Sequence, residues 1–131
     1  MIVLDASALV ELLLGTEIGR VVADEISDPK EGLHVPHLAD LEVAQTLRRL
    51  ARRGAISASA AAQALADLRA LDLERHSHEP LLERMWELRD RLTAYDAAYV
   101  ALSEALPAAL LTCDAGVARA ARRAVLLRPE A

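Results

Sequence analysis

The sequence predicts an α/β protein whose five-stranded parallel sheet is covered by helices on both faces. Short apolar runs alternate with helical hydrophobic patterns along the chain, and this alternation is typical of strand–helix–strand units. Parallel strands need crossover connections, which right-handed helical crossovers supply. A length of 131 residues suits one domain, and 53% hydrophobic with 27% charged residues is the balance of a globular protein.

The order of the elements follows from these patterns. The expected strands cover residues 2–4, 33–35, 71–73, 109–112 and 125–127. The expected helices cover residues 7–14, 17–27, 38–53, 58–70, 79–90, 94–106 and 115–123. Gly54 after the third helix and Pro80 at the start of the fifth agree with the residues that end and begin helices.

The composition argues against several classes of protein. Aromatic residues make up 2% of the chain and Phe is absent, which disfavours a stacking platform for single-stranded nucleic acid. Cys113 is the one cysteine, so neither an internal disulfide nor a cysteine-rich zinc site is expected. No apolar run approaches the roughly 20 residues of a membrane span, and residues 1–5 lack a basic leader. We therefore expect a cytoplasmic protein without a membrane partner.

Charge alone does not decide whether the protein binds nucleic acid. The net charge is −5, but Lys30 is the one Lys among fifteen cationic residues, and the arginines cluster within residues 48–53 and 119–123. Arg binds phosphate through two parallel hydrogen bonds. Solvated helix faces and a GC-rich genome explain the same bias equally well.

Acidic residues follow two of the expected strands. Asp5 directly follows residues 2–4, and Asp114 follows residues 109–112. Ligands of open parallel sheets bind beyond the carboxyl ends of the strands, so both carboxylates would lie on the ligand-binding edge. Each Asp also precedes a helix, and capping that helix is the simpler explanation of either residue alone.

A third carboxylate lies on a helix that is expected to be buried. The helix 94–106 is apolar nearly all round, and a carboxylate such as Asp96 is costly there unless it is paired, hydrogen-bonded or bound to metal. Thr93 and Asp96 also fit a capping-box-like pair at the start of this helix. Both explanations are compatible with each other.

Glu42 is the fourth carboxylate, on the helix 38–53. A projection at 100° per residue places it on a polar face with Thr46, Arg49 and Arg53. The expected buried face is made of Ala44, Leu47, Leu50 and Ala51. A solvated acid explains Glu42 alone, whereas the functional interpretation is a cleft whose wall also carries guanidinium groups for phosphates.

If these carboxylates converge, they need a cation. Several anions within a few ångströms do not all stay ionised without compensation. Mg²⁺ or Mn²⁺ meets that need through oxygen ligands and keeps waters for chemistry. A zinc site has less support, because the histidines lack helical metal-ligand spacing and residues 76–78 are expected to form a loop. A glycine-rich phosphate-binding loop also has less support, because the glycines are isolated.

Taken together, the acidic positions and their neighbours resemble the PIN domain, and more closely the VapC-type toxins of type II toxin–antitoxin pairs. The matching segments are Leu4-Asp5-Ala6-Ser7-Ala8, Leu41-Glu42-Val43, residues 93–102 and Leu111-Thr112-Cys113-Asp114. The resemblance extends over residues 2 to about 127. It implies a single PIN-like domain over residues 1–131, with a three-layer α/β/α fold and the strand order 3-2-1-4-5.

The resemblance also implies an activity and roles for individual residues. It implies a Mg²⁺-dependent endoribonuclease that cleaves RNA phosphodiester bonds with a metal-activated water. The matching acidic quartet is Asp5, Glu42, Asp96 and Asp114. Asp5, Asp96 and Asp114 would hold the ion directly or through water, while Ser7 and Thr112 would hold water or orient the acids. Arg49 and Arg53 are candidate contacts to RNA phosphates.

Expected partners are an RNA substrate, a cognate antitoxin and a second copy of the chain as a homodimer. Two other classes stay open at this point. A receiver or phosphatase-like domain also places Asp after the first strand, but it needs a Lys late in the chain, and Lys30 is the one Lys. A non-catalytic interaction module, whose acids are only helix caps, would show no specific Mg²⁺ binding by calorimetry. A DNA nuclease of the same superfamily is a third possibility.

Overall fold

A parallel sheet forms the middle of the molecule. Its strand order determines which of the residues that follow the carboxyl ends of the strands lie close together. The computed structural model describes residues 1–129, and its sheet has five parallel strands in the order β3-β2-β1-β4-β5. The strands are β1 (Ile2–Leu4), β2 (Leu33–Pro36), β3 (Leu73–His76), β4 (Ala109–Thr112) and β5 (Ala124–Leu126). This confirms the predicted fold class and the order 3-2-1-4-5.

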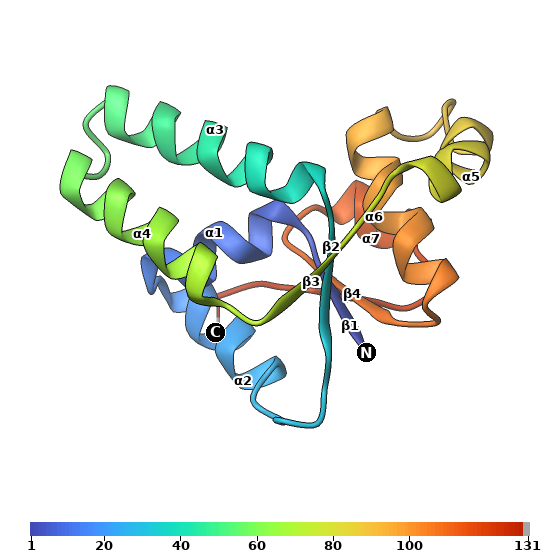
Figure 1. Ribbon diagram of the computed structural model, residues 1–131, viewed down its shortest axis with the longest axis horizontal. Coiled ribbons are helices and arrows are strands. Elements are labelled where there is room, and N and C mark those ends of the chain that lie inside the picture. Colours follow the sequence, from blue (N-terminus) through green and yellow to red (C-terminus); the bar gives the residue numbers. More distant parts are fainter. Residues whose placement is uncertain (130–131) are drawn as a thin grey trace.

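Helices cover both faces of this sheet. They are α1 (Ala6–Leu14), α2 (Glu17–Glu25), α3 (Leu38–Arg52), α4 (Ala58–Ala70), α5 (Leu82–Glu87), α6 (Ala94–Ala105) and α7 (Ala115–Ala120), with a 3₁₀ turn at Glu79–Leu81. Figure 1 shows α1 to α4 on one side of the sheet and α5 and α6 on the other. Within residues 1–129 no helix combines the length and apolarity needed to cross a bilayer.

The sheet and α6 form the centre of the core. All three residues of β1 are buried, and so is every residue of α6 from Ala97 to Ser103. Three alanines in this stretch let α6 lie close to the strands, and Tyr99 is a large side chain buried with them. The prediction that Asp96 belongs to a buried helix is therefore confirmed.

Several predicted boundaries were wrong, and the edge strand shows why. The expected strand 71–73 lies two residues later, at Leu73–His76, because the Leu71 N–H still bonds to the Asp67 carbonyl at the end of α4. β3 pairs with β2 alone and carries polar residues, so its apolar pattern is weak. The expected helix 79–90 is a 3₁₀ turn followed by α5 and ends at Glu87, and the expected helix 115–123 ends at Ala120.

The buried face of α3 also differs from the prediction. Its buried residues are Ala39, Val43 and Leu47, whereas Ala44, Leu50 and Ala51 are half-buried. Figure 1 shows the cause: the start of α3 lies over the sheet, while its second half extends outward with α4 as a helical hairpin. The face that packs against the sheet is therefore decided by the first turns of α3.

Candidate active site

An open cavity of about 570 Å³ lies where the carboxyl ends of β1 and β4 meet α1, α3 and α6. The four predicted carboxylates, Asp5, Glu42, Asp96 and Asp114, all line it. The remaining lining residues include Ser7, Thr46, Arg49, Tyr95 and Tyr99. Because β1 and β4 are neighbours in the sheet, residues more than 100 positions apart in the chain reach the same space.

Asp5 is held rigidly at the N-terminus of α1. Its buried side chain accepts hydrogen bonds from the Ala8 N–H, at 3.0 Å, and from the Ser7 hydroxyl. The Ser7 oxygen in turn accepts from the Cys113 N–H at 3.0 Å, which ties the start of α1 to the end of β4. The predicted cap is therefore confirmed, and the same carboxylate lies on the cavity.

Asp114 is arranged in the same way at the start of α7. Its carboxylate accepts from the Val117 N–H at 3.0 Å and its own N–H donates to the Thr112 hydroxyl oxygen at 3.0 Å. Thr112 is fully buried, whereas Asp114 is exposed to the cavity. Both hydroxyl residues that the resemblance singled out, Ser7 and Thr112, thus bond to the two segments that carry these acids.

Asp96 enters the cavity from the first turn of α6. The Thr93 hydroxyl oxygen caps this helix by accepting from the Asp96 N–H at 3.2 Å. The side chain of Asp96 is half-buried and lines the cavity. The capping interaction and the position on the cavity hold together, as the sequence allowed.

Glu42 receives a partner that the sequence did not indicate. The Tyr99 hydroxyl on α6 donates to Glu42 Oε1 on α3 at 2.6 Å, and Tyr99 is only 2% exposed. The apolar pattern of residues 94–106 gave no expectation for the Tyr99 hydroxyl. A buried tyrosine hydroxyl usually finds a hydrogen-bond partner, but the sequence pattern does not identify Glu42 as that partner.

Burial and mutual repulsion raise the pKa values of three of these acids. Burial raises the pKa of Asp5 most, and hydrogen bonds from Ser7, Thr112 and Ala8 oppose the rise. Burial is also the largest cause of the raised pKa of Glu42 and of Asp96, and each of these two is repelled by Asp5. No ion pair among residues 1–129 involves any of the four carboxylates. The cavity therefore concentrates negative charge without a cationic side chain paired to it.

The two predicted phosphate contacts lie in different places. Arg49 lines the cavity one turn beyond Thr46, and its Nη2 donates to the Thr46 hydroxyl oxygen at 3.3 Å. Arg53 is the exposed residue that caps the C-terminus of α3, beyond the residues that line the cavity. The predicted polar face thus reaches the cavity through Glu42, Thr46 and Arg49.

The donor set of the cavity has the composition that hard divalent cations prefer. The four predicted carboxylates, a fifth from Glu11 and the hydroxyl of Ser7 supply oxygen, and none of the histidines within residues 1–129 lines the cavity. Mg²⁺ and Mn²⁺ are bound in proteins through such oxygen donors. The raised pKa values of Asp5, Glu42 and Asp96 have the direction expected where compensating positive charge is lacking.

Comparison with known proteins identifies the class to which this fold and cavity belong. The sequence profile of the PIN domain family matches residues 2–123, so the chain belongs to the PIN-domain family. Among its relatives, ribonuclease VapC9 of Mycobacterium tuberculosis is 47% identical over 114 residues, which are 87% of this chain and 86% of that protein. Within the PIN-domain family, this identity groups the chain with the VapC ribonucleases.

Solved structures agree with the fold. The PAE2754 protein of Pyrobaculum aerophilum superposes with a TM-score of 0.75 at 27% identity, covering 95% of this chain and 88% of that one. VapC20 of Mycobacterium tuberculosis, a toxin that cleaves the sarcin-ricin loop, superposes with a TM-score of 0.72 at 18% identity, covering 98% and 100%. At 18% identity the second likeness concerns the fold alone.

Proposed function

We propose that this chain is a Mg²⁺-dependent endoribonuclease that acts as the toxin of a toxin–antitoxin pair, as a single PIN-like domain over residues 1–131. The observation that carries the proposal is the convergence of the four predicted carboxylates on one cavity, where no cationic side chain of residues 1–129 is paired with them. The similarity to VapC9, which is named a ribonuclease, supports RNA as the substrate. Mn²⁺ is the expected substitute for Mg²⁺.

Asp5, Asp96 and Asp114 would hold the cation, directly or through water, because all three line the same cavity. Ser7 and Thr112 position two of these acids through their hydroxyl groups. When bound, Mg²⁺ stabilises the negative charge that develops on a phosphodiester and favours ionisation of water. The three carboxylates would determine the position of the cation in the cavity.

Glu42 would orient the attacking water and take its proton. The Tyr99 hydroxyl occupies Oε1, which leaves Oε2 to accept a hydrogen bond from the water. The raised pKa of Glu42, caused chiefly by burial, moves this carboxylate toward the range in which a general base works near neutral pH. Tyr99 acts as a positioning residue, because its hydroxyl fixes the carboxylate plane.

Arg49 is the cation on the cavity wall that would contact an RNA phosphate. Its contact supplies local positive charge in a molecule whose net charge is −5. Arg53 would contact RNA only beyond the cavity, since it caps the C-terminus of α3. A cytoplasmic homodimer regulated by a cognate antitoxin completes the proposal; an antitoxin Arg would satisfy the same carboxylates in place of the cation.

The proposal is tested with purified protein, total RNA and Mg²⁺, followed by mapping of the new RNA ends. Asp96→Asn is expected to lower the cleavage rate by about 100-fold or more, because a cation ligand is lost. Asp24→Asn, an exposed change on α2 outside the cavity, is the matched control and is expected to cleave as the unaltered protein does. Full activity of Asp96→Asn would remove Asp96 from the mechanism, and the absence of new RNA ends with the unaltered protein would overturn the proposed activity.

A further inference from the structure

A second group of potential metal ligands lies on the outer strands of the sheet. His34 of β2 is paired in register with Glu74 of β3, and Pro36 with His76. Side chains alternate between the two faces along a strand, so His34, Glu74 and His76 all project from the same face. His34 Nδ1 lies 2.9 Å from His76 Nε2 and 3.5 Å from Glu74 Oε2. Residues 76–78 were expected to form a loop, but His76 is the last residue of β3 and its ring lies beside that of His34.

We propose that His34, Glu74 and His76 form a second cation site, which binds a Zn²⁺-type ion through two imidazole nitrogens and one carboxylate oxygen. Two histidines and one glutamate are a common ligand set for Zn²⁺, with a fourth position left for water. Mg²⁺ prefers oxygen ligands throughout, so the two sites would select different ions. None of the three residues lines the acidic cavity.

The ligand atoms of His34, Glu74 and His76 lie within 4.8 Å of one another, which is close enough for side-chain adjustment to bring them around one tetrahedral ion. Ligand atoms about 2.0–2.1 Å from a tetrahedral Zn²⁺ lie roughly 3.4 Å from one another. The separation of 3.5 Å between His34 Nδ1 and Glu74 Oε2 matches this value, whereas the 2.9 Å separation of the two ring nitrogens must widen slightly. For both rings to bind, each keeps its proton on the other ring nitrogen, and the N–H···N bond between them is replaced by two bonds to the ion.

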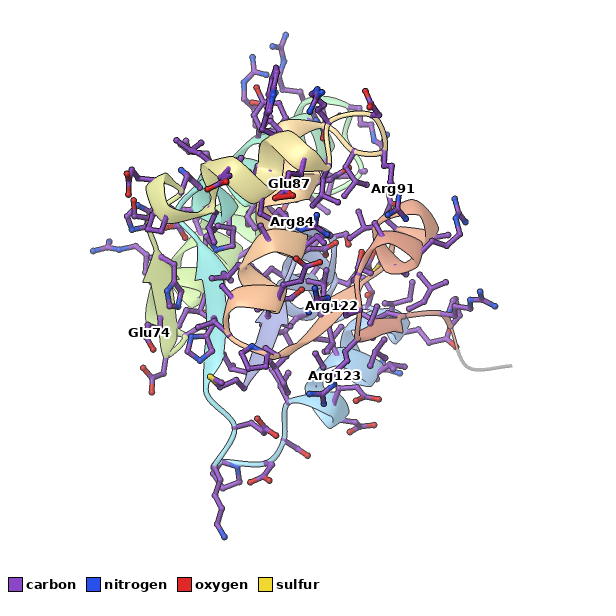
Figure 2. The ribbon with its side chains drawn as sticks, turned by 90° about the vertical axis from the view of Figure 1, so that its right-hand side faces the viewer. Glu74, Arg84, Glu87, Arg91, Arg122 and Arg123 are labelled. Atoms are coloured by element: carbon purple, nitrogen blue, oxygen red, sulfur yellow. The ribbon has the colours of Figure 1, made fainter. Side chains whose placement is uncertain are left out.

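The surroundings make the ligands available. His34 is 6% exposed, and its Nδ1 lies near both His76 Nε2 and Glu74 Oε2, so the packing of the sheet holds this ligand atom toward the other two. Glu74 is exposed and opens the site to solvent. Figure 2 shows Glu74 at the outer edge of the sheet, far from Arg84 and Arg122. Gly32 leaves room for the His34 ring, since a Cβ at Gly32 would lie 3.0 Å from His34 Nε2.

Binding there would connect β3 to β2, its one neighbour in the sheet. Zn²⁺ should therefore raise the midpoint of thermal unfolding while Mg²⁺ occupies the acidic cavity. This readout does not depend on RNA cleavage, so the site can be tested even if the proposed nuclease activity fails.

The experiment titrates Zn²⁺ into the protein in millimolar Mg²⁺ and follows the heat of binding. We expect one Zn²⁺ per chain, at least tenfold weaker binding in His76→Gln, and a smaller loss in Glu74→Gln. His37→Gln, an exposed histidine just beyond β2, is the matched control, and Asp96→Asn reports on the acidic cavity. Both are expected to bind Zn²⁺ as the unaltered protein does.

The proposal is overturned if the unaltered protein takes up no Zn²⁺, or if His76→Gln binds it undiminished. It is equally overturned if His37→Gln or Asp96→Asn loses binding to the same extent as His76→Gln. Should His76→Gln fail to fold, Co²⁺ replaces Zn²⁺ in the unaltered protein. Visible absorption bands of a tetrahedral site with nitrogen ligands then support the site, and their absence contradicts it.

Discussion

At the N-terminus of α1, one side chain satisfies the backbone of the helix and also faces the cavity. The Asp5 carboxylate accepts from the Ala8 N–H and the Ser7 hydroxyl, and it lies among the other three acids. The favourable environment of a helix N-terminus offsets part of the cost of burying this charge. Asp114 repeats the arrangement at α7, where it accepts from the Val117 N–H.

Tyr99→Phe tests the contact between α6 and α3. The change removes the hydroxyl that donates to Glu42 Oε1 at 2.6 Å and keeps the buried ring. A hydrogen bond to a charged group contributes about 1.5–3 kcal/mol, so cleavage of RNA with Mg²⁺ should slow by about tenfold or more. Asp24→Asn, an exposed change on α2 outside the cavity, serves as the control. Unchanged cleavage by Tyr99→Phe would mean that Glu42 does not need this positioning.

At the level of helices and strands, the pattern of the sequence predicts most of the fold. The apolar run of β1 and the alternation of strands and helices suffice for a parallel sheet, and the acids after β1 and β4 mark its functional edge. β3 was misplaced because an edge strand with Glu74, Arg75 and His76 has little apolar signal. The contacts from Tyr99 to Glu42 and from His34 to His76 depend on how separate elements pack, which a pattern along the chain does not contain.

Asp114 allows the structural role of a cap to be separated from the role in the cavity. Asparagine caps helices as well as aspartate does, whereas alanine costs about 1 kcal/mol. Asp114→Asn should therefore keep the free energy of unfolding, and Asp114→Ala should lower it by about that amount in a urea titration. Both variants should lose RNA cleavage because both lose the carboxylate. If Asp114→Asn cleaves RNA normally, the residue is only a cap.

At the scale of the whole molecule, the carboxylates of the acidic cavity lower the free energy of unfolding when no divalent cation is bound. The pKa values of Asp5 and Asp96 are raised above the usual 3.8, and that of Glu42 above 4.5. Above these usual values the folded chain holds protons that the unfolded chain has released. The free energy of unfolding contributed by these groups therefore falls as the pH rises.

This effect predicts how stability depends on pH. Without divalent cations, the free energy of unfolding in urea should fall as the pH rises above the usual pKa values of 3.8 and 4.5. Asp5→Asn should show a weaker fall, because asparagine does not titrate and still caps α1. Added Mg²⁺ should restore stability at pH 7 in the unaltered protein only. The same slope in both proteins would show that Asp5 holds no extra proton in the folded state.

Mn²⁺ binding, measured by electron paramagnetic resonance, tests most directly whether the carboxylates of residues 5, 42, 96 and 114 share a cation. The unaltered protein should bind Mn²⁺ saturably, with Mg²⁺ as a competitor, and the doubly altered Asp5→Asn/Asp96→Asn protein should bind it at least tenfold more weakly while remaining folded. Asp24→Asn should bind as the unaltered protein does. Equal Mn²⁺ binding by the unaltered and doubly altered proteins would contradict a shared cation at these carboxylates.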